Sequence, residues 1–198
     1  MKFLKNLFQK PSYPNFWNDY ISCFESEKSS GNYFVFDCET TGLKPTKDYL
    51  LSIGGVQVNS CRILIKDSLE IYVQQAYFNP DSAHIHGIVK EHDFPTLEEA
   101  EAVKLFLKKV KNHTLVGHHV SFDIAMINQA LKRMQLPKLK NKILDTNTLY
   151  LEKNHIPSEQ RYSLDELCEI FKLPKKDRHT AAGDAFLTAQ VLLQLLSQ

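Results

Sequence analysis

The chain has 198 residues, of which 43% are hydrophobic and 24% are charged, and its formal net charge is +1. These values are typical of a globular protein with a substantial core, and they argue against a strongly basic protein that coats nucleic acid passively. The four cysteines form no C-x-x-C pair, and no apolar run reaches the roughly 18 residues that a membrane span needs. We therefore expect a cytoplasmic protein with reduced cysteines and no membrane association.

Residues 1–30 predict an N-terminal helical extension. The segment "NFWNDYISCF" places aromatic and aliphatic residues at helical spacing, with Asn15 as the expected N-cap. We expect this helix to pack on the main domain, since amphipathic stripes usually face their own core, and an arm that binds a partner is the alternative. The main domain is expected over residues 31–198.

The main domain opens with predicted strands over residues 33–38 and 50–58. The segments "CRILI" and "LEIYVQQ" predict two more strands around a turn at Asp67-Ser68. In the second of these, apolar and polar residues alternate from Leu69 to Gln74, which is typical of a half-exposed antiparallel strand. The first half of the domain therefore reads as an antiparallel meander.

Helices and short strands alternate in the second half. The segment "TLEEAEAVKLFLKKV" predicts a helix with a capping box between Thr96 and Glu99. A strand "TLVGH", a helix "SFDIAMINQALKRM" capped by Ser121, a strand "KILDT" and two further helices, "SLDELCEIFKL" and "TAAGDAFLTAQVLLQLLS", follow. A meander followed by such units predicts an α/β fold, in which a mixed sheet carries helices on its faces.

Acidic residues stand at unusual places in this pattern. Asp37 and Glu39 end the first strand and point to the same face, because side chains two residues apart on a strand do so. A polar strand end that leads into a turn would also explain them. Asp123 could simply favour a helix N-terminus, whereas Asp184 lies in a helix among apolar residues. His179 can share a site with Asp184 only if it precedes that helix, and the charged run "KLPKKDR" predicts a loop there.

Taken together, these acids form a pattern. "FDCETTGL", "VGHHVSFD" and "HTAAGDA" follow one another in order, with "HIHGI", "LDTNTLY" and "YSLDELC" as smaller matches between them. Over residues 32–196 the chain resembles the DEDDh 3′–5′ exonucleases, which include the proofreading epsilon subunit of bacterial DNA polymerase III, ribonuclease T and oligoribonuclease. One departure is His119, where the family usually has Asn, and there we expect a change in loop geometry without loss of activity.

The resemblance implies a ribonuclease H-like fold with a mixed five-stranded sheet, an antiparallel meander plus parallel strands, flanked by helices. It implies two divalent metal ions, Mg²⁺ or Mn²⁺, which oxygen ligands suit. In that arrangement Asp37 bridges both ions, Glu39 and Asp184 complete one site, and Asp123 supports the other through water. His179 would be the general base, and the metal-free site should be loose or partly protonated.

The same resemblance implies a substrate site for single-stranded 3′ ends of nucleic acid, from which nucleoside 5′-monophosphates are released. The residues expected to contact the terminal nucleotide are Thr40, Thr41, Gly42, Leu43, His86, His118 and Phe122. His84 and His86 could instead be a His-x-His metal pair, although no further ligand stands nearby. DNA and RNA both remain open as substrates.

Two rival functions stay under consideration. A haloacid-dehalogenase-type phosphatase also opens with an acidic strand end, but Glu39 stands where it requires Asp, and no second acid follows Asp184 closely. A non-catalytic nucleic-acid-binding domain of the same fold would be indicated by a missing ligand or base, and none is missing. A polymerase or another replication or repair protein is a further expected partner. Because no segment follows the last predicted helix, a stand-alone or auxiliary enzyme is favoured.

Overall fold

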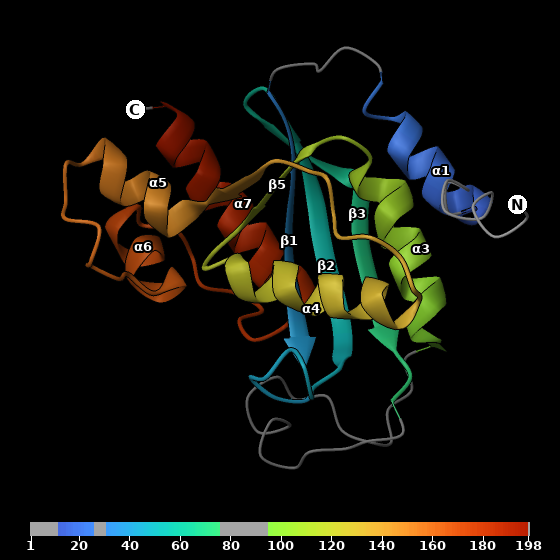
Figure 1. Ribbon diagram of the computed structural model, residues 1–198. Helices are drawn as coiled ribbons and strands as arrows, with labels where there is room; N and C mark the ends of the chain where they lie inside the picture. The colour runs from blue at the N-terminus through green and yellow to red at the C-terminus, as the bar shows by residue number, and fades with distance from the viewer. Residues whose placement is uncertain (1–11, 26–30, 76–94, 198) are drawn as a thin grey trace, which may run out of the picture.

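A single six-stranded sheet organises the computed structural model, which describes residues 12–25, 31–75 and 95–197 (Figure 1). The strand order is β4-β3-β2-β1-β5-β6. The strands are β1 (Asn32–Thr40), β2 (Leu50–Asn59), β3 (Arg62–Val73), β4 (Thr96–Leu97), β5 (Thr114–Gly117) and β6 (Ile143–Asp145). β1, β2 and β3 pair antiparallel, whereas β5 runs parallel to β1 and β6 parallel to β5. The predicted mixed sheet is confirmed.

Two details of the sheet differ from the prediction. The sixth strand is β4, which pairs parallel with the end of β3 and uses residues predicted to open a helix. The prediction of a turn at Asp67-Ser68 is also wrong, because β3 is continuous there. Leu64 pairs with Gln57 and Leu69 with Gly55, so β3 absorbs its extra residues in a bulge. Pairing with β2 thus overrides the local turn preference of Asp and Ser.

The helices are α1 (Asn15–Ser22), α3 (Glu99–Val110), α4 (Ser121–Arg133), α5 (Thr146–Lys153), α6 (Leu164–Ile170) and α7 (Ala181–Ser197). The three predicted caps are wrong. α1, α3 and α4 follow Pro14, Glu98 and Val120, and none of them has a side-chain cap hydrogen bond. α6 instead has a capping box between Ser163 and Glu166.

The two faces of the sheet pack against different helices. In Figure 1, α4 crosses in front of the strands and α7 lies behind them. Phe34 and Phe36 of β1 join the cluster that contains α3, α4 and α1, where Trp17 is 2% exposed. Val35 faces the other way and packs with α7. α1 therefore packs on the main domain as expected, and α7 covers the opposite face.

In the part of the chain that the structure describes, no helix combines the length and the apolar character needed to cross a bilayer. All four cysteines lie in this part, and none of them forms a disulfide.

Candidate active site

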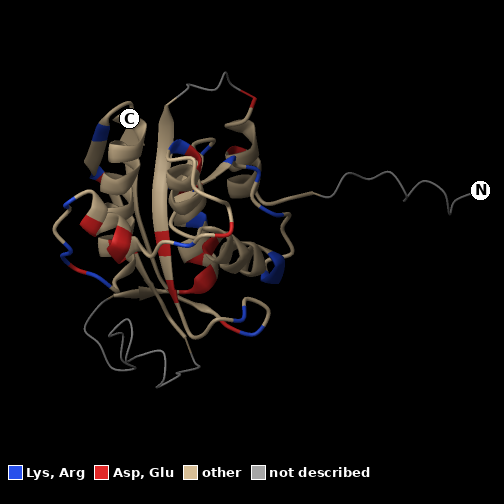
Figure 2. Ribbon diagram, turned by 90° about the vertical axis from the view of Figure 1, so that its left-hand side faces the viewer, with Lys and Arg blue, Asp and Glu red and all other residues tan. Residues whose placement is uncertain are grey.

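The end of β1 carries two carboxylates on the face that α7 covers. Asp37 and Glu39 leave the strand on the same side, since they are two residues apart. Cys38 between them belongs to the apolar cluster on the other face. The alternation predicted from the sequence is therefore confirmed, and Figure 2 shows acidic segments on the central strand with others on helices to both sides of it.

The beginning of α7 lies directly against β2, next to Asp37. In the sheet Asp37 pairs with Gly54, and a Cβ atom on Gly54 would stand 2.1 Å from the backbone carbon of Ala181. Only a residue without a side chain allows this approach. Asp184, in the first turn of α7, consequently reaches the strand end, where one oxygen each from Asp37, Glu39 and Asp184 lies within 4.8 Å of the others.

Asp123 reaches the same strand end from α4, which follows β5. Its side chain is 5% exposed, and its Oδ1 accepts a hydrogen bond from the backbone N–H of Cys38 at 3.2 Å. It stands outside the group of three carboxylates, but its charge acts on Asp37. The structure therefore brings all four predicted acids to the end of β1, with Asp123 set apart from the rest.

Burial and mutual repulsion raise the pKa values of these carboxyls. Burial first, then the charges of Asp123, Asp184 and Glu39, hold the pKa of Asp37 well above its usual range. Burial, followed by the charge of Asp184, raises the pKa of Glu39 to about 7. Burial also raises the pKa of Asp123 to about 8. Without a cation the site is partly protonated at neutral pH, as the sequence predicted.

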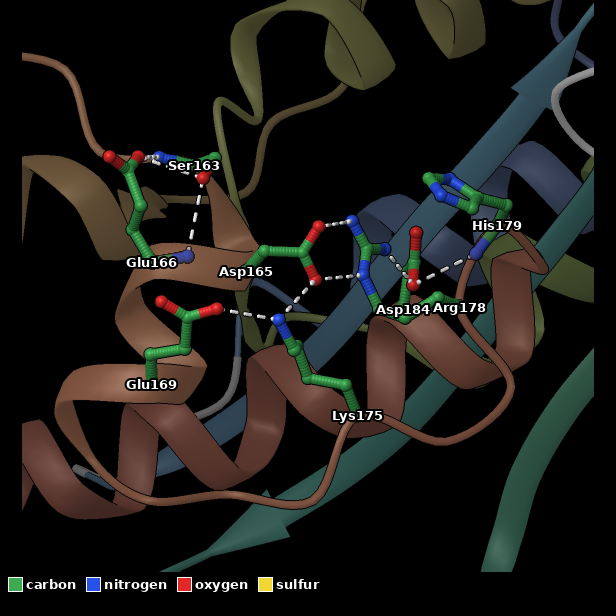
Figure 3. Close-up of polar contacts among 8 residues, drawn as sticks. All are labelled: Ser163, Asp165, Glu166, Glu169, Lys175, Arg178, His179 and Asp184. Carbon is green, nitrogen blue, oxygen red and sulfur yellow. Dashed lines mark hydrogen bonds and ion pairs between the residues drawn. The ribbon is translucent and has the colours of Figure 1, made fainter.

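His179 lies in the loop before α7, as its predicted role requires. Its backbone N–H donates to Oδ1 of Asp184 at 3.3 Å, and its side chain is exposed (Figure 3). Its φ of 63° places it in the left-handed region. An imidazole that is open to solvent beside clustered carboxylates can exchange protons with water.

The loop after Glu39 is shaped by its threonines and by Asp48. Thr40 Oγ1 donates to the carbonyl of Gly42 at 2.9 Å, and Thr41 Oγ1 accepts from the N–H of Tyr49 at 3.0 Å. A Cβ atom on Gly42 would lie 2.7 Å from Asp48 Oδ2, so a side chain there would require the Asp48 carboxylate to move. Leu43 is 84% exposed beside the site. Contact between this loop and a nucleotide stays a prediction.

The remaining predicted substrate contacts have different positions. His118 is held inside the protein: its Nε2 lies 2.9 Å from the carbonyl of Tyr162 and its Nδ1 lies 3.0 Å from Thr146 Oγ1. Burial lowers the pKa of His118 to about 4, so the ring is neutral and belongs to the scaffold of the site. His119 is exposed with a φ of 55°, and Phe122 is partly buried against the core. His84 and His86 lie outside the described residues.

The ion pairs of Arg178 with the acids around it were not predicted from the sequence. Arg178 forms an ion pair with Asp184 and also binds Asp165 of α6 (Figure 3). In the sequence Arg178 is one of several charges in a loop, and Asp165 is an ordinary acid near a helix start. Arg178 and Asp165 are distant from each other and from β1 in the sequence, so no periodic pattern of residues indicates that they pair.

The donors at this site fit a hard divalent cation. Asp37, Glu39 and Asp184 offer carboxylate oxygens only, and Mg²⁺ and Mn²⁺ prefer such ligands. The raised pKa values show that ionising these groups together is costly, and a divalent cation would remove that cost. The residues present therefore match the metal site that the resemblance implies.

Comparison with known proteins settles the family. The family model RNase_T, described as "Exonuclease", matches residues 34–192. The chain belongs to this exonuclease family. It is 32% identical over 171 residues to DNA polymerase III subunit epsilon of Aquifex aeolicus, covering 85% of this chain and 82% of that protein. The family assignment sets the phosphatase alternative aside.

A second relative is DNA polymerase III PolC-type of Caldanaerobacter subterraneus subsp. tengcongensis, with 33% identity over 178 residues. The match covers 88% of this chain, which spans only 12% of that protein. Among solved structures, the zinc-bound complex of E. coli exonuclease I with single-stranded DNA superposes with a TM-score of 0.75 at 17% identity. That match covers 85% of this chain and 41% of the other. It shows that this chain has the same ribonuclease H-like fold.

Proposed function

We propose that this chain is a metal-dependent 3′–5′ exonuclease that shortens single-stranded nucleic acid and releases nucleoside 5′-monophosphates. The observation that carries the proposal is the convergence of Asp37, Glu39 and Asp184 within 4.8 Å, at a strand end that Asp123 also reaches. All four acids and His179 are present, which favours an enzyme over a non-catalytic domain. The family assignment supports the reaction class.

In this proposal the four acids hold two divalent ions, Mg²⁺ or Mn²⁺. Asp37 is central because its carboxyl feels the charges of all three other acids. When bound, such a pair of ions favours ionisation of the attacking water and offsets charge on the leaving oxygen. With Asp37, Glu39 and Asp184 would hold one ion, and Asp123 would help to hold the other.

The remaining steps belong to the side chains of this chain. His179 accepts a proton from the attacking water at an imidazole nitrogen, and its exposed position leaves it free to return that proton to solvent. The loop of Thr40, Thr41, Gly42 and Leu43 holds the terminal nucleotide, with the exposed Leu43 available for apolar contact with its base. Phe122 borders the sugar.

Digestion of 5′-labelled single-stranded DNA and RNA, with Mg²⁺, Mn²⁺ or EDTA, tests the proposal. We expect a ladder that shortens from the 3′ end and disappears in EDTA, and the two substrates together measure the preference for DNA or RNA. Asp37→Ala should lower the rate about a thousandfold, since metal ions supply several kcal/mol of charge stabilisation. His179→Ala should lower the rate with metal still bound. Undiminished cutting by Asp184→Asn would overturn the ligand assignment.

We further propose that this protein works in the cytoplasm with a polymerase or another replication or repair protein. The names of its relatives, DNA polymerase III subunit epsilon and PolC-type, support this partner. Size-exclusion chromatography of the purified chain with the purified replicative polymerase of the same cell should give a common peak. Separate elution at micromolar concentrations would leave the chain as a stand-alone enzyme.

A further inference from the structure

Arg178 connects the carboxylate cluster to a helix that carries none of the four acids. Its Nε donates to Asp165 Oδ1 at 2.8 Å and its Nη2 approaches Asp165 Oδ2 at 3.4 Å. Its Nη1 forms an ion pair with Oδ1 of Asp184. Figure 3 shows the guanidinium between the two carboxylates, one from α6 and one from α7.

The backbone around Arg178 is held in an uncommon conformation. Asp177 and His179, its two neighbours, have φ values of 54° and 63°, in the left-handed region that side chains disfavour. Such conformations persist where the surroundings impose them. Here Thr180 Oγ1 donates to the carbonyl of Asp177 at 2.8 Å and accepts from the N–H of Gly183 at 3.1 Å. The loop is thus fastened to the first turn of α7.

Gly183 allows this close packing. A Cβ atom at that position would lie 1.9 Å from the carbonyl oxygen of Asp177, so a side chain there would push the loop away from the helix. The loop that contains Arg178 and His179 and the helix turn that contains Asp184 are therefore one packed unit.

Two groups of this unit bind the same oxygen of Asp184. Oδ1 receives the backbone N–H of His179 at 3.3 Å and the Nη1 of Arg178. The N–H of His179 and the positive charge of Arg178 both act on Oδ1, which leaves Oδ2 as the oxygen more available to bind a cation. Arg178 therefore determines which oxygen of Asp184 is available as a ligand.

Asp165 balances the charge of Arg178. Burial alone would lower the pKa of Arg178, but hydrogen bonds to Asp165 and Asp184 outweigh it and keep the group charged. In the described part of the chain, its ion pairs are with these two carboxylates. An arginine that directs two of its nitrogens to Asp165 competes less with a metal ion for Asp184 than an unpaired cation would.

We propose that Arg178, held by Asp165, is a positioning residue that orients Asp184 as a metal ligand and fixes the loop of His179. The inference rests on the proposed function of the site. It assigns to α6 a part in metal binding, although α6 supplies no ligand.

Mn²⁺ binding, measured by electron paramagnetic resonance without substrate, tests this role apart from turnover. We expect Arg178→Gln and Asp165→Asn each to weaken Mn²⁺ binding about 10- to 100-fold, the usual effect of losing a residue that orients a ligand. Lys175→Gln is the matched control, because Lys175 lies 3.9 Å from Asp165 and 2.7 Å from Glu169 but does not pair with Asp184. Its Mn²⁺ affinity should stay within about twofold of the unmodified chain.

The double variant separates positioning from a general loss of structure. If Asp165 acts through Arg178, then Arg178→Gln with Asp165→Asn should bind Mn²⁺ no more weakly than Arg178→Gln alone. Wild-type Mn²⁺ affinity in Arg178→Gln, or full additivity of the two effects, overturns the inference. If Arg178→Gln fails to fold, Asp165→Asn carries the test by the same measurement. A wild-type chain that binds no Mn²⁺ and cuts nothing would instead refute the proposed function.

Discussion

The two faces of the sheet differ in the residues that β1 contributes to them. On the face of α3 and α4, Phe34 and Phe36 of β1 are buried with Phe106, whose ring centroid lies 5.2 Å from that of Phe36. On the face of α7, Val35 is buried in the same way, but the next residue on that side is Asp37. One face is therefore apolar from Phe34 to Cys38, while the other changes from apolar packing to carboxylates.

The two faces therefore have different effects on the stability of the fold. Apolar burial is favourable in proportion to the area removed from water, so the α3 and α4 face stabilises the fold. Clustered carboxyls with raised pKa values do the opposite in the absence of a cation. We infer that apolar packing on the face of α3 and α4 offsets the repulsion among the carboxylates. Those carboxylates have to lie close together in order to bind metal.

The largest expected effect comes from breaking the apolar face. Phe36→Ala should lower the free energy of unfolding by about 3–5 kcal/mol, because it removes a fully buried ring and leaves a cavity. Urea unfolding followed by circular dichroism measures this loss. The exposed Phe186→Ala is the control and should change stability by less than about 0.5 kcal/mol. Equal losses for the two variants would contradict the comparison.

Displacing the first turn of α7 from β2 should reduce the cleavage rate more than it reduces the stability of the fold. Gly54→Ala puts a methyl group against the backbone of Ala181, so the first turn of α7 must shift and carry Asp184 with it. A displacement of about 1 Å can lower the rate about a hundredfold. The initial rate of 3′ shortening measures this, with Ile65→Ala as control, since Ile65 lies on β3 and is 67% exposed. An unchanged rate in Gly54→Ala would show that the contact does not position Asp184.

The carboxylates that meet at the end of β1 should make metal-free stability depend on pH. Glu39, with a pKa of about 7, and Asp123, with a pKa of about 8, hold protons in the folded state that the unfolded chain has released. Between pH 7 and 8.5 the folded state therefore binds more protons, and the free energy of unfolding should fall as pH rises. The slope is at most about 1.4 kcal/mol per pH unit for each group.

His118 acts in the other direction, but mainly below about pH 6.5, where the unfolded chain takes up its proton. Urea titrations in EDTA at several pH values measure the slope, and Asp123→Asn should flatten it. Stability that rises with pH in this window would refute the partly protonated site.

The smallest effect concerns the attachment of α1. Tyr20 of α1 donates its hydroxyl to Asn141 Oδ1 at 2.6 Å and accepts from the N–H of Lys140 at 2.8 Å. Tyr20→Phe should lower the free energy of unfolding by about 1 kcal/mol, since it leaves the part-buried N–H of Lys140 and the Oδ1 of Asn141 without this partner, and should leave cleavage unchanged. Thermal unfolding and the cleavage rate, measured on the same preparation, test both statements. A fall in the cleavage rate would mean that α1 does more than complete the core.

The sequence predicted most of what depends on spacing along the chain. Asp37 and Glu39 were placed on one face because a strand has a period of two. His179 was placed before the last helix because the charged run around Pro174 breaks helical periodicity. The helix predicted in "NFWNDYISCF", which is α1, and the mixed sheet followed from apolar patterns in the same way.

What the sequence did not predict depends on contacts across the fold. The turn expected at Asp67-Ser68 became a bulge because β2 continues alongside β3. Thr96, expected in a capping box, pairs with Tyr72 in the sheet instead. Arg178 was one charge among several, and its ion pairs exist only once α6 and α7 are packed together.

The position of α7 has a consequence for synthesis. β1, with Asp37 and Glu39, leaves the ribosome early, whereas His179 and Asp184 emerge only after every strand of the described sheet has been made. A nascent chain that lacks this helix has neither the third carboxylate nor the proposed base. We expect translation products truncated before residue 179 to be unable to degrade nucleic acid, so cutting begins only after the segment that forms α7 has been released.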